Sequence, residues 1–152
     1  MLACSDRATL MTALDTIIRL VQTVPARRAL LIEAGWNLVR ARVAIRWQPF
    51  KAAIAFGAIP LGSRRPVEGK ELVEAIVAVA ARVPWRSVCF DQALALQRAL
   101  RRRGRDARLH YGISAPALGP LEAHVWVVLD GCTILGAEQA GCHQPVAIFP
   151  AA

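Results

Sequence analysis

The chain has 152 residues, of which 55% are hydrophobic, and a formal net charge of +8 at pH 7. A chain of this length can bury roughly two-thirds of its unfolded surface in one core, so folding requires neither a metal nor a disulfide. Charged residues interrupt each apolar run before it reaches the roughly 18 residues of a membrane-spanning helix, no export signal is recognisable, and the four cysteines lack CxxC spacing. We therefore expect a single domain, 1–152, with reduced thiols and a cytoplasmic location.

The N-terminal part, residues 1–60, is predicted to be helical. Apolar residues recur at helical spacing from Ser5 to Val24, which predicts a helix that ends before Pro25. Pro25 can occupy the first turn of a second helix that reaches about Trp47. The arginines and tryptophans of this second helix would suit peripheral contact with a membrane. We expect them instead to be buried against neighbouring helices, because so apolar a chain must cover its stripes.

A linker is predicted at residues 57–71, where the sequence GAIPLGSRRPVEGKE contains three glycines and two prolines. A third helix follows over about 70–83 and ends before Pro84. The core of the domain is then expected over 70–152.

The next helix places a thiol at its start. In the stretch RSVCFDQALALQRALRRRG, Ser87 is a favoured N-cap residue, and Cys89 falls in the first helical turn. Unpaired backbone N–H groups and the positive end of the helix dipole converge there, and both favour a thiolate over a thiol. The alternative is that the thiol simply packs in the core, because Cys89, Ala93, Leu96 and Leu100 recur at helical spacing.

The arginines near the end of this helix, Arg101 to Arg103, are expected to face solvent at the negative end of the helix dipole, before a left-handed cap at Gly104. The other arginines are scattered over several predicted elements, and few aromatic residues accompany them to stack on bases. The positive charge therefore does not indicate a partner nucleic acid, whereas docking of an acidic peptide stays open.

After Gly104 the apolar period changes from helical spacing to strict alternation, which predicts strands. Asp130-Gly131 is a strong signal for a hairpin between the second and third of these strands. Helices followed by a meander-like antiparallel sheet predict an α+β fold. The strands are expected at residues 107–113, 124–129, 133–135 and 146–149.

The second of these strands carries a histidine. Alternation places His124, Trp126 and Val128 on one face of the strand. A lone histidine in a strand is more often a hydrogen-bonded structural residue than a catalyst. Together with Cys89, however, it supplies what nucleophilic catalysis needs, because the imidazole can take the thiol proton and the thiolate can then attack a carbonyl.

The stretch from Val83 to Gly136, VPWRSVCFDQALALQRALRRRGRDARLHYGIS…LEAHVWVVLDGCTILG, resembles the transglutaminase-like cysteine peptidases of lasso peptide biosynthesis. The preceding RRALLIEAGWNLVRARVAIRWQPF is also similar to the N-terminal half of that family. The most specific parts are C..QALALQ..LRRRG and AHVWV…DG, in this order.

This resemblance implies a papain-like, transglutaminase-like core in which a helix presents the cysteine to an antiparallel sheet that carries the histidine. By the same resemblance, Cys89 is the nucleophile and His124 the general base of a leader peptidase. Such an enzyme removes the leader from a ribosomally made lasso peptide precursor before the macrolactam is closed. No cofactor is implied for the hydrolysis.

The third catalytic residue departs from the family pattern. Many members have an aspartate twelve positions after the histidine, where this chain has Gly136. Asp130 is about 20 Å from His124 along an extended strand and is better explained as the turn residue. After the hairpin, residues 136–138 return beside the histidine, so that Glu138 can reach Nδ1. A backbone carbonyl, or no acidic partner, is the alternative.

The oxyanion hole is expected to begin with the backbone N–H of Cys89, with Gln92 or Trp85 as a second donor. Gln92 can equally be an ordinary residue of the helix surface. The spacing of Cys132, Cys142 and the histidine that follows lacks a second close pair, so no metal site is expected.

The resemblance further implies a split system, because the chain starts with helices and not with a leader-binding domain. The expected partners are the precursor peptide, a separate small leader-recognition protein and the ATP-dependent lasso cyclase. The basic and apolar N-terminal helices are a candidate dock for the leader and its recognition protein. Two other functions stay open, namely a non-catalytic module that binds peptide, RNA or membrane, and an acyltransferase that uses the same Cys-His site.

Overall fold

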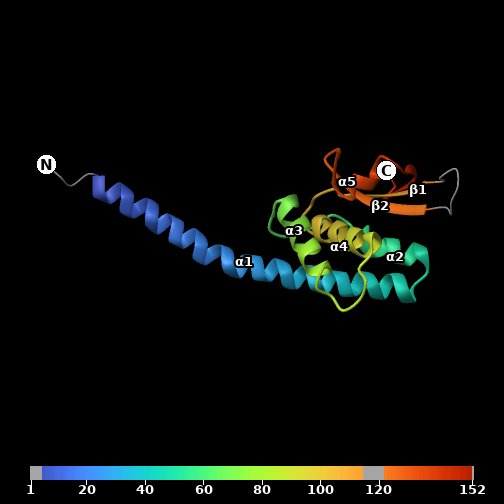
Figure 1. Ribbon diagram of the computed structural model, residues 1–152, viewed down its shortest axis with the longest axis horizontal. Helices are drawn as coiled ribbons and strands as arrows, with labels where there is room; N and C mark the ends of the chain where they lie inside the picture. Colours follow the sequence, from blue (N-terminus) through green and yellow to red (C-terminus); the bar gives the residue numbers. More distant parts are fainter. Residues whose placement is uncertain (1–4, 115–121, 152) are drawn as a thin grey trace.

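The computed structural model describes residues 5–114 and 122–151, with the backbone alone described for 5–24 and 139. One helix, α1 (Ser5–Trp47), takes the place of the two that the sequence predicted, so the expected break at Pro25 is wrong. Proline has a φ angle that a helix accepts, although it removes one backbone hydrogen bond. Beyond Pro25, α1 packs against two further helices, and these contacts hold it in the helical conformation (Figure 1).

Three more helices complete the helical layer. Of these, α2 was not predicted, and it begins directly after Pro49, which ends α1 and starts a new turn. The segment between α2 and α3 has no regular structure but is bound to the body, since the N–H groups of Gly62 and Arg64 donate to carbonyls at the end of α4. The three helices are α2 (Phe50–Gly57), α3 (Gly69–Ala80) and α4 (Cys89–Arg101).

A four-stranded antiparallel sheet follows in the order β3-β2-β1-β4, which confirms the α+β fold. The hairpin between β2 and β3 turns at Asp130 and Gly131, whose φ angles of 51° and 80° are those of the expected left-handed turn. One short helix that was not predicted, α5, lies between β3 and β4. The elements are β1 (Arg108–Ser114), β2 (Glu122–Leu129), β3 (Cys132–Leu135), α5 (Ala137–Ala140) and β4 (Gln144–Phe149).

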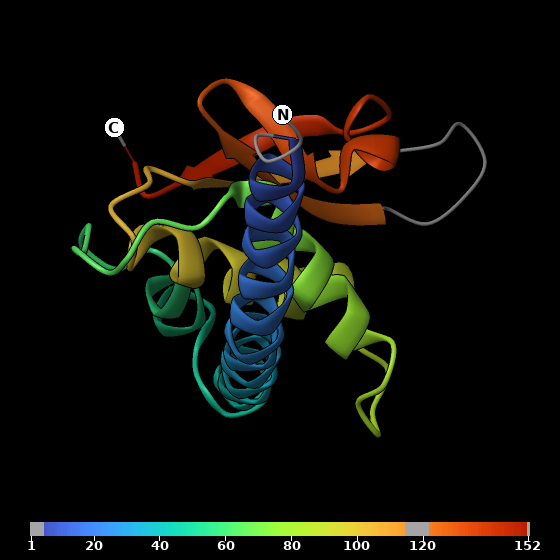
Figure 2. The same cartoon turned by 90° about the vertical axis from the view of Figure 1, so that its left-hand side faces the viewer.

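The helices lie on one side of this sheet (Figure 2). Helix α4 lies between α1 and the sheet, because its side chains contact α1, α2, α3 and β2. The predicted apolar face of α4 is confirmed, since Ala93, Leu96 and Leu100 are completely buried. In the part of the chain that the structure describes, no helix combines the length and apolarity needed to cross a membrane.

The arginines at the C-terminal end of α4 do not face solvent as a group. Arg101 is buried and donates to the carbonyl of Ile59 and to Asp106. Arg103 has a side chain that is only 6% exposed and forms a bidentate ion pair with Glu33 of α1. The expected solvated run is therefore wrong, because tertiary contacts offer these guanidinium groups carboxylates and carbonyls that the local sequence does not reveal.

Candidate active site

Cys89 is the first residue of α4, one position nearer the helix start than predicted. The N-cap residue is Val88 and not Ser87. The reason is that the Val88 N–H donates to Oδ2 of Asp91, at 3.2 Å, so an aspartate within the first turn caps the helix. The thiol is consequently held at the end of the helix where free backbone N–H groups point out.

Asp91 is the buried anchor of this helix start. Its carboxylate is fully buried, and Arg42 of α1 lies 3.7 Å from it. Burial raises the pKa of Asp91, while the Val88 N–H, the Arg42 guanidinium and the Trp85 indole oppose that rise. The residue thus ties the position of Cys89 to the long helix α1.

His124 lies on β2, where its ring is fixed from three directions. It stacks on Trp126 with a centroid distance of 6.1 Å and lies against the ring of His143 at 5.2 Å. Its Nε2 is 3.3 Å from the carbonyl oxygen of Gly136, the residue just after β3. Because a carbonyl can only accept, Nε2 carries the proton, and Nδ1 is left with a lone pair.

Gly136 brings its carbonyl to this ring because it has no side chain. Its φ angle is +80°, and a Cβ placed there would lie 3.0 Å from Nε2 of His124. A side chain at this position would therefore combine backbone strain with a collision. The absence of an aspartate here leaves room for the backbone itself to contact the imidazole.

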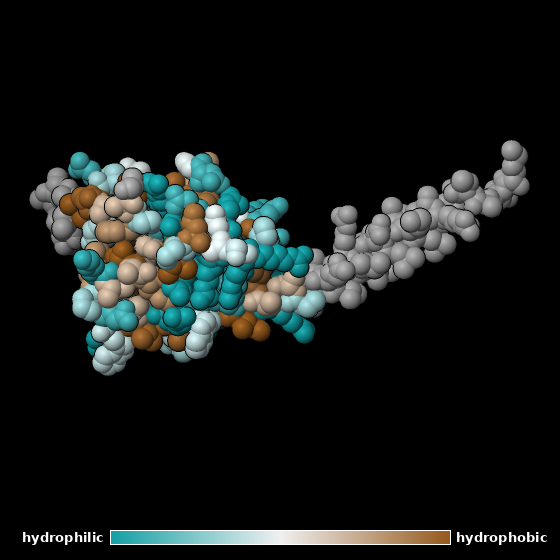
Figure 3. Space-filling view, turned by 180° about the vertical axis from the view of Figure 1, so that it is seen from behind, coloured by the Kyte–Doolittle hydropathy of each residue, from teal (hydrophilic) through white to brown (hydrophobic). Residues whose placement is uncertain are grey.

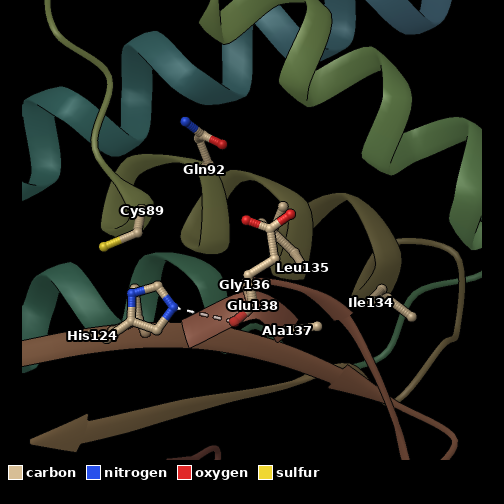
Figure 4. A pocket seen from close by; sticks show the side chains of 9 residues that line it. Cys89, Gln92, His124, Ile134, Leu135, Gly136, Ala137 and Glu138 are labelled. Atoms are coloured by element: carbon tan, nitrogen blue, oxygen red, sulfur yellow. Dashed lines mark hydrogen bonds between the residues drawn. The ribbon is translucent and has the colours of Figure 1, made fainter. Parts of the chain in front are cut away.

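Cys89 and His124 line the same cavity, which has a volume of about 450 Å³. Figure 4 shows the thiol at the start of α4 and the imidazole on β2 facing each other, with Nδ1 on the side of Cys89 and Nε2 on the side of Gly136. The two residues are 35 positions apart in the sequence, and only the packing of α4 on the sheet brings them together. This geometry suits proton transfer from the thiol to Nδ1.

A comparison with protein-family models matches residues 30–144 to the transglutaminase-like superfamily, which is more than half of the chain and includes both residues. The chain belongs to the transglutaminase-like superfamily. Members of this superfamily are typically cysteine peptidases or acyltransferases. The comparisons with curated proteins and with solved structures found no match.

The third residue of the transglutaminase-like site is where the geometry differs from the expectation. The ring nitrogen that faces the returning chain is Nε2, not Nδ1, because the ring turns its Nδ1 edge toward Cys89. Glu138, in the first turn of α5, is exposed and lines the cavity. Its role as third catalytic residue stays a prediction. Asp130 is bound in the hairpin turn, where it pairs with Arg105.

The other predicted site residues fall into two groups. Gln92 is half-buried and lines the cavity, whereas Trp85 faces the Asp91 carboxylate. Cys132 and Cys142 are free and exposed, and no cluster of three or more metal-ligating side chains occurs among the described residues. Cys4 lies outside them.

The sequence interpretation missed two residues around the imidazole. Nothing in the pattern of the chain indicates that His143 lies against His124, because the two are joined only through α5 and the start of β4. Asp91 did carry a signal, since an acidic residue three positions after an N-cap often caps a helix. That signal becomes specific only once Val88 is identified as the N-cap.

Proposed function

We propose that this transglutaminase-like protein is a cysteine peptidase that removes the leader from a ribosomally made lasso peptide precursor before macrolactam closure. The observation that carries the proposal is the cavity shared by Cys89 and His124, with Nδ1 turned toward the thiol. The resemblance of residues 83–136 to lasso leader peptidases supports the choice of substrate class. Hydrolysis by this pair needs no cofactor.

In this proposal His124 takes the thiol proton on Nδ1. The resulting imidazolium keeps its Nε2–H on the carbonyl of Gly136, which orients the ring and stabilises its positive charge. The Cys89 thiolate attacks the scissile carbonyl and forms a thioester as the amine of the core peptide leaves with the imidazolium proton. Water then hydrolyses the thioester and releases the leader.

The oxyanion that forms during the attack meets the N-terminal end of α4. The Val88 N–H is already donated to Asp91, so the Cys89 N–H is the first backbone donor that can turn to the substrate. The Gln92 side chain lines the same cavity and is the second donor in this proposal. Asp91 contributes indirectly, because it fixes the turn that carries the Cys89 N–H.

The proposal includes a division of labour with other proteins. A separate small recognition protein holds the leader and presents it to the cavity, and an ATP-dependent cyclase consumes the freed N-terminus of the core peptide. All three act in the cytoplasm, without nucleic acid. The basic surface of the chain suits an acidic peptide segment, because opposite charges raise the rate of encounter.

The test combines the purified chain with its precursor peptide, with and without the recognition protein, and follows the products by mass spectrometry. Hydrolysis adds the mass of water to the leader fragment, whereas an acyltransferase adds the mass of an acceptor. We expect hydrolysis, and faster turnover when the recognition protein is present at limiting precursor. Transfer products would assign the site to the acyltransferase alternative, and an inert Cys89 would assign the chain to the binding modules.

A further inference from the structure

The part of α1 that follows Pro25 is apolar on two opposite faces. One face is in the core and includes the fully buried Leu38 and Ala41. The opposite face, which we call the outer face of α1, is exposed to solvent. Its five side chains and their exposed fractions are Ile32 74%, Trp36 60%, Val39 40%, Val43 49% and Trp47 77%.

These five residues form one continuous ridge. Their spacings of four, three, four and four positions keep them on one side of a helix with 3.6 residues per turn. At about 1.5 Å per residue, the ridge is roughly 22 Å long. The outer face lies on the side of α1 away from the sheet, along the lower edge of the body in Figure 1. The sequence-based expectation that this helix buries its tryptophans is therefore wrong for Trp36 and Trp47.

Exposed tryptophans on a ridge require an explanation, since single exposed apolar residues are common but contiguous patches mark contact sites. Figure 3 shows brown apolar side chains among teal polar ones along the same lower edge. The indole of Trp47 lies beneath the Arg46 guanidinium, at 5.5 Å. Both groups are of the kind that occupies the boundary between water and lipid acyl chains.

The charges beside the ridge are positive. By helical periodicity, Arg28 and Arg46 lie along one flank of it and Arg40 along the other. The one acidic residue between Pro25 and Trp47 is Glu33, and Arg103 and Arg64 neutralise it on the inner side of the helix. The outer face thus complements an anionic surface.

We propose that the outer face of α1 binds an anionic membrane surface, with the helix lying in the plane of the lipid headgroups. A second copy of the chain fits this face less well, because a symmetric pair of α1 helices would bring arginines against arginines without carboxylates between them. A ridge also suits a lipid boundary better than a protein groove, since lipids adapt to its shape. The catalytic cavity lies on the sheet side of α4 and stays open in this orientation.

The experiment uses the full chain and large unilamellar vesicles. One set contains equal parts of phosphatidylglycerol and phosphatidylcholine, and the other contains phosphatidylcholine alone. We expect the partition coefficient from co-sedimentation to be at least about tenfold higher on the anionic vesicles and to fall at high salt. We also expect a blue shift of tryptophan emission. Equal binding to both sets, or no binding to either, overturns the proposal.

Two variants sharpen the test. The double variant Trp36→Ser with Trp47→Ser removes the exposed indoles and should lower the partition coefficient at least about tenfold. Val146→Ser with Ile148→Ser removes two exposed apolar side chains from β4 and should leave it unchanged. Circular dichroism verifies that both remain folded. Unaltered vesicle binding by the tryptophan variant contradicts the proposal.

The same variants identify other occupants of the outer face. Sedimentation velocity that shows a dimer of the wild type, lost in the tryptophan variant and accompanied by no vesicle binding, assigns this face to a second copy. Binding of the recognition protein that the tryptophan variant loses, again without vesicle binding, assigns it to a protein. Either result overturns membrane binding. Neither depends on whether the chain is a peptidase.

Discussion

The two ends of helix α4 treat their unpaired backbone groups in opposite ways. At the N-terminal end, Asp91 takes the N–H of Val88, and the thiol of Cys89 opens into a cavity. At the C-terminal end, the carbonyls of Arg101 and Arg102 accept hydrogen bonds from the segment before α3. One end of the helix is left open to a substrate, and the other is closed by the protein itself.

The closed end also pairs its charges. The buried Arg103 guanidinium meets both carboxylate oxygens of Glu33, at 3.0 and 2.7 Å. Burial alone would raise the pKa of Glu33, but the hydrogen bonds from Arg103 and the charges of Arg103, Arg64 and Arg102 outweigh it and lower the pKa. The difference between the two ends teaches that polarity in this fold is structural where it is paired and chemical where a cavity adjoins it.

The largest expected effect is at the open end. Cys89→Ala should reduce precursor cleavage by at least about 10⁴-fold, because a methyl group cannot attack a carbonyl. The fold should be unaffected, since the side chain is only partly buried. Cleavage assays and thermal melts of the purified variant measure both quantities. Turnover by a pure variant would exclude Cys89 as nucleophile.

At the closed end, Arg103→Met should lower the free energy of unfolding by about 2–4 kcal/mol, because it leaves the Glu33 carboxylate half-buried and without its main partner. The matched control is Arg105→Met, which breaks an exposed ion pair with Asp130 and should cost less than about 1 kcal/mol. Urea unfolding measures both. Equal losses in the two variants would mean that the closed end is not held by its buried pair.

The lowered pKa of Glu33 predicts a pH dependence of stability. Its contribution should be present above about pH 4.3, the pKa of a glutamate in an unfolded chain, and should disappear as the pH falls through the lower folded-state pKa. Glu33→Gln removes this dependence, so wild type and variant should converge in stability at low pH. Unfolding curves between pH 2 and 7 test this. A constant difference across that range would contradict the assigned charge interaction.

The smallest expected effect concerns the third residue of the open end. Because the Gly136 carbonyl already accepts from Nε2 of His124, Glu138→Gln should lower the rate of cleavage less than about tenfold. The control Asp130→Asn should leave the rate unchanged, since asparagine also tolerates the left-handed turn conformation. A loss of 10²-fold or more in the Gln variant alone would show that the Glu138 carboxylate takes over from the carbonyl during the reaction.

Local signals in the sequence predicted the elements near the site well. The position of Cys89 at a helix start, the Asp130-Gly131 hairpin and the strand of His124 all follow from short-range patterns, and each is confirmed. The continuous helix through Pro25 was not predictable in this way, because packing against α3 and α4 supports it.

The contacts that decide the chemistry are not local. The Gly136 carbonyl reaches His124 only because β3 pairs with β2 and the chain then turns at a positive φ angle. Arg103 finds Glu33 across 70 residues of sequence. A pattern of residue types cannot contain such distances, so the orientation of the imidazole and the closure of the far end of α4 required the structure.

The most direct test of the account compares the three described thiols within one sample. Cys132 and Cys142 are exposed, whereas Cys89 is only partly so. If the helix start and His124 activate Cys89, brief treatment with iodoacetamide near neutral pH, read by peptide mass spectrometry, should alkylate it faster than the two exposed cysteines. His124→Ala should abolish that advantage. Alkylation of Cys89 more slowly than Cys132 and Cys142, or at a rate unaffected by His124→Ala, would contradict the central claim that these two residues form a catalytic pair.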